Sequence, residues 1–204
     1  MSFSTSSRRN DRRPEEGNAT VPAPTPQPSW DSDSTRYLTP RTPGQSDAWA
    51  EEAAQDKRRG GQRLLGAGGV VPPDGIARAL GLADGEEVIV RRRLILLDGS
   101  PVELADSYYP ARVAAGTALA EPRKVPGGAV TLLADLGYTA TRVEEAVTAR
   151  MPTESEREAL ELGDNEPVLV LSRIVFAGDG LPMEACEMTM TAKERTLRYR
   201  MRLA

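Results

Sequence analysis

The chain has 204 residues, enough for one domain with a hydrophobic core, and 39% of them are hydrophobic. Its formal net charge of −4 argues against tight DNA binding, because neutralising DNA phosphates requires a basic surplus. The absence of histidine removes imidazole catalysis and the commonest metal ligand, while the single Cys186 excludes an internal disulfide and suits a reducing compartment. We therefore expect no catalytic residues, no metal, no cofactor and no enzymatic activity.

The first 33 residues are predicted to form a disordered arm. They are rich in serine, arginine and proline, and every second residue over 21–28 is a proline. Such a composition cannot bury enough apolar surface to offset the entropy of ordering the chain. Neither this arm nor any later segment contains an apolar run long enough for a signal or membrane anchor. We therefore predict a soluble, cytoplasmic protein.

Order is predicted to begin at residue 34 with a short β-prone run, 34–40, followed by a helix over 47–57. A strand with several glycines follows over 62–71. A unit of helix, strand, hairpin and strand then occurs twice. Its predicted elements are a helix over 74–80 with strands over 87–97 and 102–109, and a helix over 152–160 with strands over 168–176 and 183–191. A helix over 129–136 and a strand over 140–150 separate the two copies, and a strand over 196–202 ends the chain.

The internal repeat is the strongest single feature of the sequence. Eight residues between Ala79 and Arg93 recur at a constant offset between Ala159 and Arg173. Neither copy alone could cover its apolar face, so the two copies are expected to form one pseudo-symmetric domain. The elements predict an α+β fold with a mostly antiparallel, six-stranded sheet and helices packed against it.

Arginines on strands that face the core are the best candidates for ligand binding. Over 88–97 the alternation places Arg91 and Arg93 on one face among aliphatic side chains, and the repeat places Arg173 in the same situation. Burying an arginine is costly unless its charge is compensated. Each therefore either pairs with a repeat-related acid, Glu103 or Glu184, or binds an anionic ligand.

Two residues of the return strands, Tyr108 and Glu187, are weaker candidates, and core packing is the alternative for the tyrosine. The predicted effector site consists of Arg91, Arg93, Tyr108, Arg173 and Glu187.

Several motifs spread from residue 88 to residue 202 carry a family resemblance. They cover 88–94, 98–99, 101–110, 132–138, 143–150, 167–173 and 197–202. In this order they resemble the UTRA domain, the effector-sensing part of transcription regulators in the HutC branch of the GntR family. The resemblance implies a ligand-sensing domain over residues 34–204, with a fold similar to chorismate lyase. It also implies a small-molecule effector, a homodimer and a role in regulating DNA-templated transcription.

The chain departs from the family pattern in two respects. Members usually carry a DNA-binding winged helix ahead of this domain, which the first 33 residues do not resemble, so we expect no direct DNA binding and a partner regulator. The alternatives are a shortened DNA-binding regulator and a chorismate-lyase-like enzyme. Members that bind phosphorylated sugars tend to have Arg-x-Arg and a glutamate where this chain has Arg93 with Ile95 and Ala105. The resemblance therefore implies an effector less polar than a sugar phosphate.

Overall fold

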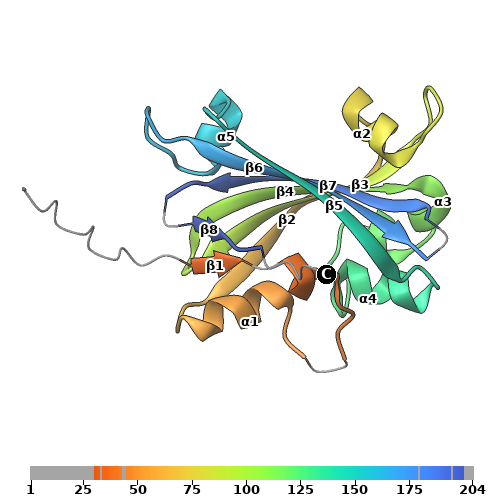
Figure 1. Cartoon of the computed structure of the whole chain (residues 1–204), viewed down its shortest axis with the longest axis horizontal. Helices are drawn as coiled ribbons and strands as arrows, with labels where there is room; N and C mark the ends of the chain where they lie inside the picture. The colour runs from red at the N-terminus through yellow and green to blue at the C-terminus, as the bar shows by residue number, and fades with distance from the viewer. Residues whose placement is uncertain (1–29, 33, 43–44, 179, 194, 200–204) are drawn as a thin grey trace, which may run out of the picture.

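A six-stranded antiparallel sheet forms the centre of the computed structural model, which describes residues 30–32, 34–42, 45–178, 180–193 and 195–199. The strand order is β2-β3-β4-β7-β6-β5 (Figure 1). The strands are β2 (Gly60–Val70), β3 (Val88–Leu97), β4 (Ser100–Pro110), β5 (Ala140–Arg150), β6 (Val168–Ala177) and β7 (Pro182–Thr191). The predicted α+β fold, with helices packed against this sheet, is confirmed.

The two copies of the repeat lie side by side in the sheet. The hairpins β3–β4 and β6–β7 join through their return strands, with the pairing of β4 and β7 running from Glu103↔Met190 to Tyr108↔Ala185. Each hairpin is preceded by a short helix, α2 (Asp74–Leu80) or α5 (Glu154–Ala159). These helices stand on the same face of the sheet at opposite ends (Figure 1). The pseudo-symmetry expected from the sequence is thus present in the fold.

The first hairpin turns where its sequence requires it. Asp98 and Gly99 both have positive φ angles, 54° and 93°, as a two-residue turn of the mirror-image type demands. The Asp98 carboxylate also accepts hydrogen bonds from the Arg59 backbone N–H at 2.7 Å and from Nε of Arg58 at 2.8 Å. These bonds tie the turn to the start of β2.

The remaining helices cover the opposite face of the sheet, where α1 and α4 lie in Figure 1. They are η1 (Ser34–Leu38), α1 (Ala48–Gln55), α3 (Ala111–Ala114), η2 (Ala118–Ala120) and α4 (Gly128–Asp135). The side chain of Asp47 starts α1 by accepting a hydrogen bond from the Ala50 N–H at 2.8 Å. Trp49 of α1 then packs with Ile95 and Leu97 of β3 and with Met188 and Met190 of β7. The space between this layer and the sheet contains the candidate site.

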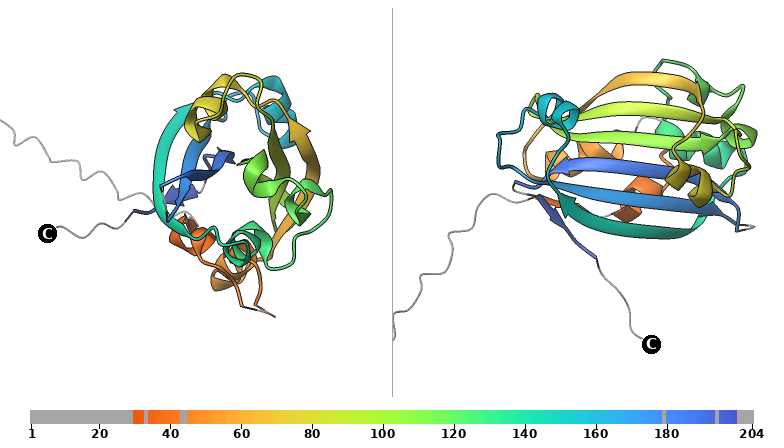
Figure 2. Two further views of the ribbon diagram at one scale, coloured as in Figure 1. Left: turned by 90° about the vertical axis from the view of Figure 1, so that its right-hand side faces the viewer. Right: turned by 90° about the horizontal axis from the view of Figure 1, so that it is seen from above.

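A small parallel sheet joins the two ends of the described chain. It consists of β1 (Trp30–Ser32) and β8 (Arg195–Leu197), and Figure 2 shows β8 beside the main sheet. The arm was predicted to extend to residue 33, but residues 30–32 form this strand; residues 1–29 lie outside the described residues. The pairing joins segments far apart in sequence, so no local pattern in the arm indicates it.

Two further element predictions are corrected. The run 34–40 forms the 3₁₀ helix η1 rather than a strand, because its side chains are held by tertiary contacts, including a hydrogen bond from the Tyr37 hydroxyl to Glu52 at 3.0 Å. The last strand is shorter than the predicted 196–202, since β8 ends at Leu197 and residues 200–204 lie outside the described residues.

Candidate functional site

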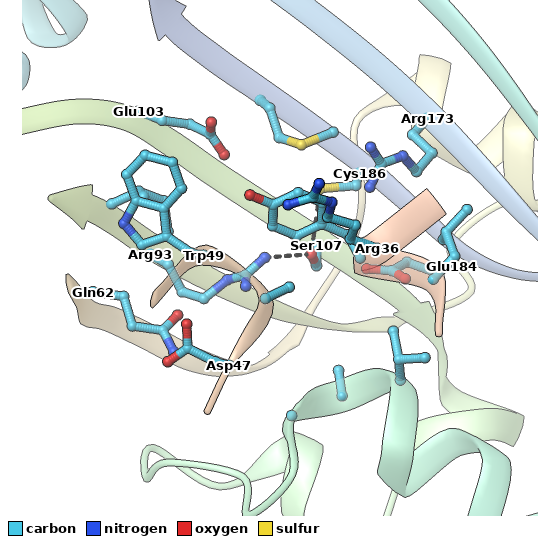
Figure 3. A pocket seen from close by; sticks show the side chains of 18 of the residues that line it. Arg36, Asp47, Trp49, Gln62, Arg93, Glu103, Ser107, Arg173, Glu184 and Cys186 are labelled. Carbon is cyan, nitrogen blue, oxygen red and sulfur yellow. Dashed lines mark hydrogen bonds between the residues drawn. The ribbon is translucent and has the colours of Figure 1, made fainter. Parts of the chain in front are cut away.

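A cavity of about 180 Å³ lies between the sheet and the layer formed by η1, α1 and α4 (Figure 3). Pockets for drug-sized ligands typically measure about 300–1,000 Å³, so this cavity suits a smaller molecule. Its floor consists of side chains from four neighbouring strands. They are Arg93 and Ile95 of β3, Glu103, Ser107 and Tyr109 of β4, Leu171 and Arg173 of β6, and Glu184, Cys186, Met188 and Met190 of β7.

Arg93 is a half-buried cation with spare hydrogen-bonding capacity. Its Nη2 donates to the Ser107 hydroxyl at 3.1 Å, and Ser107 in turn donates to Sγ of Cys186 at 3.3 Å. Its Nε is buried and has no hydrogen-bond partner among the described residues. Burial works against the charge, but Tyr109, Cys186 and neighbouring carboxylates raise the pKa of Arg93. The guanidinium therefore stays charged without forming an ion pair within the described part of the chain.

Arg173 also lines the cavity and, unlike Arg93, has an acidic partner. Its Nε lies 2.6 Å from Oε1 of Glu145 on β5, and its Nη2 donates to the Ser34 hydroxyl at 2.9 Å. The two paired side chains are only 10% and 9% exposed. Although burial opposes the charged form, Cys186 and Glu145 raise the pKa of Arg173. The pair anchors both η1 and the edge strand β5 to the cavity.

The ion pairs anticipated from the repeat do not form. Glu103 lies opposite Ile95 in the sheet and pairs with Arg195 at 3.0 Å. Oε1 of Glu184 accepts the Tyr109 hydroxyl at 2.9 Å. The alternative in which Glu103 or Glu184 neutralises a repeat arginine is therefore not found, because the sheet register gives each acid another partner.

Cys186 contributes a neutral, polarisable surface to the cavity floor. Burial, reinforced by Glu184, raises the pKa of the Cys186 thiol to about 12, so it carries no charge at neutral pH. Met188 and Met190 continue this surface along β7. Together with Ile95 and Leu171 they give the site an apolar half.

Arg91 has a structural role at the border of the cavity. Its guanidinium donates to the backbone carbonyls of Leu119 and Glu121, both at 2.9 Å, and of Arg123 at 2.8 Å. These bonds fix the loop that leads to α4. Arg91 also borders a neighbouring cavity of about 360 Å³, which shares Arg93 and Tyr109 with the first.

Tyr108 and Glu187 lie on the other face of the sheet. The Tyr108 ring packs with α2 and β3 residues, while its hydroxyl donates to Asp106 at 3.4 Å; Glu187 is exposed opposite Asp106. Their neighbours Tyr109 and Cys186 face the cavity instead. Of the five predicted residues, the structure brings together Arg93 and Arg173 in the cavity and places Arg91 beside it.

The functional residues that sequence reasoning missed fall into two groups. Ser107, Tyr109 and Cys186 belong to the repeat strands, where the correct strand register would have indicated them. The residues that cover the cavity, such as Tyr37 and Trp49, lie outside the repeat and give no sequence signal. Within the described residues no group of three or more histidine, cysteine or acidic side chains is placed to hold a metal ion. No helix in the same ranges is long and apolar enough to cross a membrane.

Comparisons with known proteins agree with this architecture. A curated relative, the uncharacterized HTH-type transcriptional regulator SCO4628 of Streptomyces coelicolor, is 34% identical over 112 residues. That match covers 53% of this chain and 42% of the relative, so the chain spans less than half the length of that regulator.

Solved structures of effector domains share the fold. The effector domain of PhnF from Mycobacterium smegmatis matches with a TM-score of 0.67 and 21% identity, covering 76% of this chain and 94% of that one. The C-terminal domain of the histidine utilization repressor from Pseudomonas syringae pv. tomato matches with a TM-score of 0.60 and 19% identity, covering 71% and 100%.

The family model of the UTRA domain matches residues 56–194, more than half of the chain. The resemblance inferred from the ordered motifs is confirmed, as is the predicted class of function, a small-molecule-sensing regulatory domain of the GntR type. The matches are to transcription regulators and do not favour a lyase-like enzyme. The chain belongs to the UTRA domain family.

Proposed function

We propose that the cavity beneath the sheet binds a small anionic effector and that Arg93 is its principal contact. The observation that carries this proposal is the Arg93 guanidinium, which lines the cavity without a carboxylate partner and has a buried Nε with no hydrogen-bond partner among the described residues. A desolvated charge is costly unless an opposite charge compensates it. A carboxylate is a good partner, because its two oxygens match the planar guanidinium fork.

The apolar half of the cavity supports an effector less polar than a sugar phosphate. Ile95 stands where sugar-phosphate binders of this family tend to have a second arginine, and it is 7% exposed within the hydrophobic core. Leu171, Met188 and Met190 extend the same surface. An effector with one acidic group and an apolar body would match both halves of the cavity.

We also propose that the domain forms a homodimer through its edge strand β5. Nine of the eleven residues of β5 are exposed, whereas the opposite edge strand β2 is covered by α1 and η2. An antiparallel pairing with its two-fold axis at Val147 would set Arg150 of each copy opposite Glu144 of the other. The exposed Val147 would then pack against its own copy across the axis. Pairing would also satisfy the free edge of the sheet.

The acidic balance of the chain supports regulation through another DNA-binding unit. With a net charge of −4 the chain as a whole lacks the basic surplus that grips phosphates, so we propose that a partner regulator in the cytoplasm reads the DNA. A sequence-specific mobility shift with nanomolar protein alone would contradict this part of the proposal.

A thermal-shift screen of small metabolites tests the effector proposal. Wild-type protein is expected to be stabilised by at least one anionic compound, and Arg93→Met is expected to lose that response while remaining folded. Equal stabilisation of both proteins by every active compound would contradict the role given to Arg93.

A further inference from the structure

Half of the charged side chains that line the cavity are already neutralised within the chain. Three arginines are held in ion pairs with carboxylates, and these pairs leave no net charge for a ligand. The pairs are Arg41 with Glu51, Arg173 with Glu145, and Arg195 with Glu103.

Two more charged residues at the cavity form hydrogen bonds within the chain. Asp47 accepts the Ala50 N–H and caps α1, as described above. Arg36 is exposed and donates from Nη1 to the side-chain carbonyl of Gln55 at 2.9 Å. Burial raises the pKa of both Tyr37 and Tyr109 above the ordinary range, so these phenols are neutral. Arg36 keeps its charge at the exposed rim, so the charges that remain in the interior of the cavity are those of Arg93 and Glu184.

Arg93 and Glu184 face the same cavity and do not bond to each other. Arg93 reaches the Ser107 hydroxyl, which contacts Cys186, and Glu184 lies two residues before Cys186 on the same face of β7. Two residues along a strand span about 6.6 Å. Figure 3 shows Arg93 on one side of Ser107 and Glu184 on the other. The Ser107–Cys186 contact therefore lies between a positive and a negative group.

The Glu184 carboxylate has capacity for a further hydrogen bond. Its side chain is mostly buried, with 9% of the residue exposed, and its Oε1 accepts the Tyr109 hydroxyl. A carboxylate accepts about four hydrogen bonds through its two oxygens. A phosphate dianion next to Arg93 would meet one uncompensated cation and the negative Glu184, and this arrangement disfavours it. A ligand that carries both charges would compensate both residues.

Building on the proposed effector site, we propose that the effector is a zwitterion, an apolar α-amino acid. Its carboxylate binds the guanidinium of Arg93, and its ammonium donates to Glu184. Its side chain packs on the sulfur-rich surface of Met188 and Met190. The assignment follows from the residual charges of the cavity together with its small volume and apolar half.

A matched ligand series tests the class of molecule. Isothermal titration calorimetry would be run with each of the twenty standard amino acids, with the carboxylic acid that lacks the amino group, and with the amine that lacks the carboxylate. At least one apolar amino acid is expected to bind, and each truncated analogue is expected to bind about thirtyfold more weakly or worse. Equal affinity of the carboxylic acid would overturn the zwitterion, as would the absence of binding by any amino acid.

Substitutions separate this inference from the proposed function. Glu184→Gln keeps an acceptor for Tyr109 but removes the negative charge, so the carboxylic acid is expected to bind more tightly than its amino acid. The control Glu187→Gln, on the exposed face of the same strand, is expected to keep the wild-type preference. An unchanged preference in Glu184→Gln would overturn the zwitterion. If a wider screen finds an anion that is not an amino acid and whose binding depends on Arg93, the proposed effector site is supported and the zwitterion is overturned. If Arg93→Met binds every ligand as the wild type does, both the effector site and the zwitterion are overturned.

Discussion

Arg93 and Arg173 occupy equivalent positions in the two repeats and line one cavity, but only Arg173 has a carboxylate partner within the described residues. The difference lies in the neighbouring strands. β6 is flanked by β5, which supplies Glu145, whereas β3 is flanked by β2, where Leu64 stands opposite Arg93. The repeat therefore places two identical side chains symmetrically, and the non-repeated strands give a carboxylate partner to Arg173 but not to Arg93.

Replacing Arg173 is expected to destabilise the fold. Arg173→Met leaves the Glu145 carboxylate buried without its partner, which costs about 3 kcal/mol in the free energy of unfolding. Urea unfolding at pH 7 measures the loss. The double variant Arg173→Met/Glu145→Gln is expected to recover part of it, since no charge is then stranded. Wild-type stability of the single variant would show that the pair is not buried in solution.

Replacing Arg93 is expected to leave the stability nearly unchanged and to abolish the response to the effector. Arg93→Met strands no carboxylate, and the Ser107 hydroxyl keeps its contact with Cys186, so the unfolding free energy should stay within about 1 kcal/mol of wild type. The same urea measurement, paired with the thermal-shift screen, should show normal stability and no effector response. A loss comparable to that of Arg173→Met would identify Arg93 as structural.

Arg91 is expected to control the loop in front of α4. Arg91→Gln removes charge-assisted hydrogen bonds to the carbonyls of 119, 121 and 123, and we expect a loss of about 2 kcal/mol. Hydrogen exchange should accelerate over 118–125. The neighbouring Arg92→Gln is a matched control, because its ion pair with Asp106 is exposed and contributes little. Equal exchange rates in both variants would contradict the assignment.

Sequence alone predicted the strands that carry the candidate site, but two of the predicted residues, Tyr108 and Glu187, lie on the other face of the sheet. If every residue after the Asp98-Gly99 turn paired in regular register, Tyr108 would lie on the same face of the sheet as Arg91. A β-bulge after Ile95 skips one residue of β4, however, and turns Tyr109 to the cavity instead. The second hairpin has the equivalent bulge after Val175, which places Cys186 rather than Glu187 on the face of Arg173. A one-residue shift reverses every side chain beyond it, and nothing in the local sequence marks the bulge.

The cover of the cavity was beyond sequence reasoning for a different reason. Ser34 and Tyr37 reach their partners Arg173 and Glu52 across long sequence separations, and the strand around Trp30 gains its hydrogen bonds from β8. Such contacts depend on tertiary placement rather than on periodicity. The repeat arginines, by contrast, were identifiable because a charged residue interrupts an aliphatic face at the same position twice.

Reversing one charge on β5 is expected to weaken the proposed homodimer. Glu144→Arg would set two arginines opposite each other on both sides of the two-fold axis, so sedimentation velocity should show a shift toward monomer. The double reversal Glu144→Arg/Arg150→Glu breaks the Arg150–Glu156 ion pair but puts opposite charges back across the axis, so the dimer is expected to return. Glu158→Arg, an exposed position on α5, serves as a control and should leave the sedimentation unchanged. A monomeric wild type, or an unaffected Glu144→Arg dimer, would exclude this interface.

Acid is expected to remove a stabilising contribution of Glu156. Arg150 is the main cause that lowers the pKa of Glu156 to about 2, from an ordinary value of 4.5, helped by the Thr153 N–H and the Thr189 hydroxyl. Because the folded-state pKa is depressed, this contribution is fully present above the unfolded-state value and is lost as the pH falls from 4.5 toward 2.

The comparison with Glu156→Gln isolates that contribution. The difference in urea midpoint between wild type and the variant should be constant at pH 6 to 5 and should shrink steadily between pH 4.5 and 3, since protonated glutamic acid resembles glutamine. Glu158 has an exposed side chain, so the control variant Glu158→Gln is expected to show no such trend. A difference that stays constant down to pH 3 would mean that the Arg150 contact does not hold the Glu156 carboxylate in its charged form.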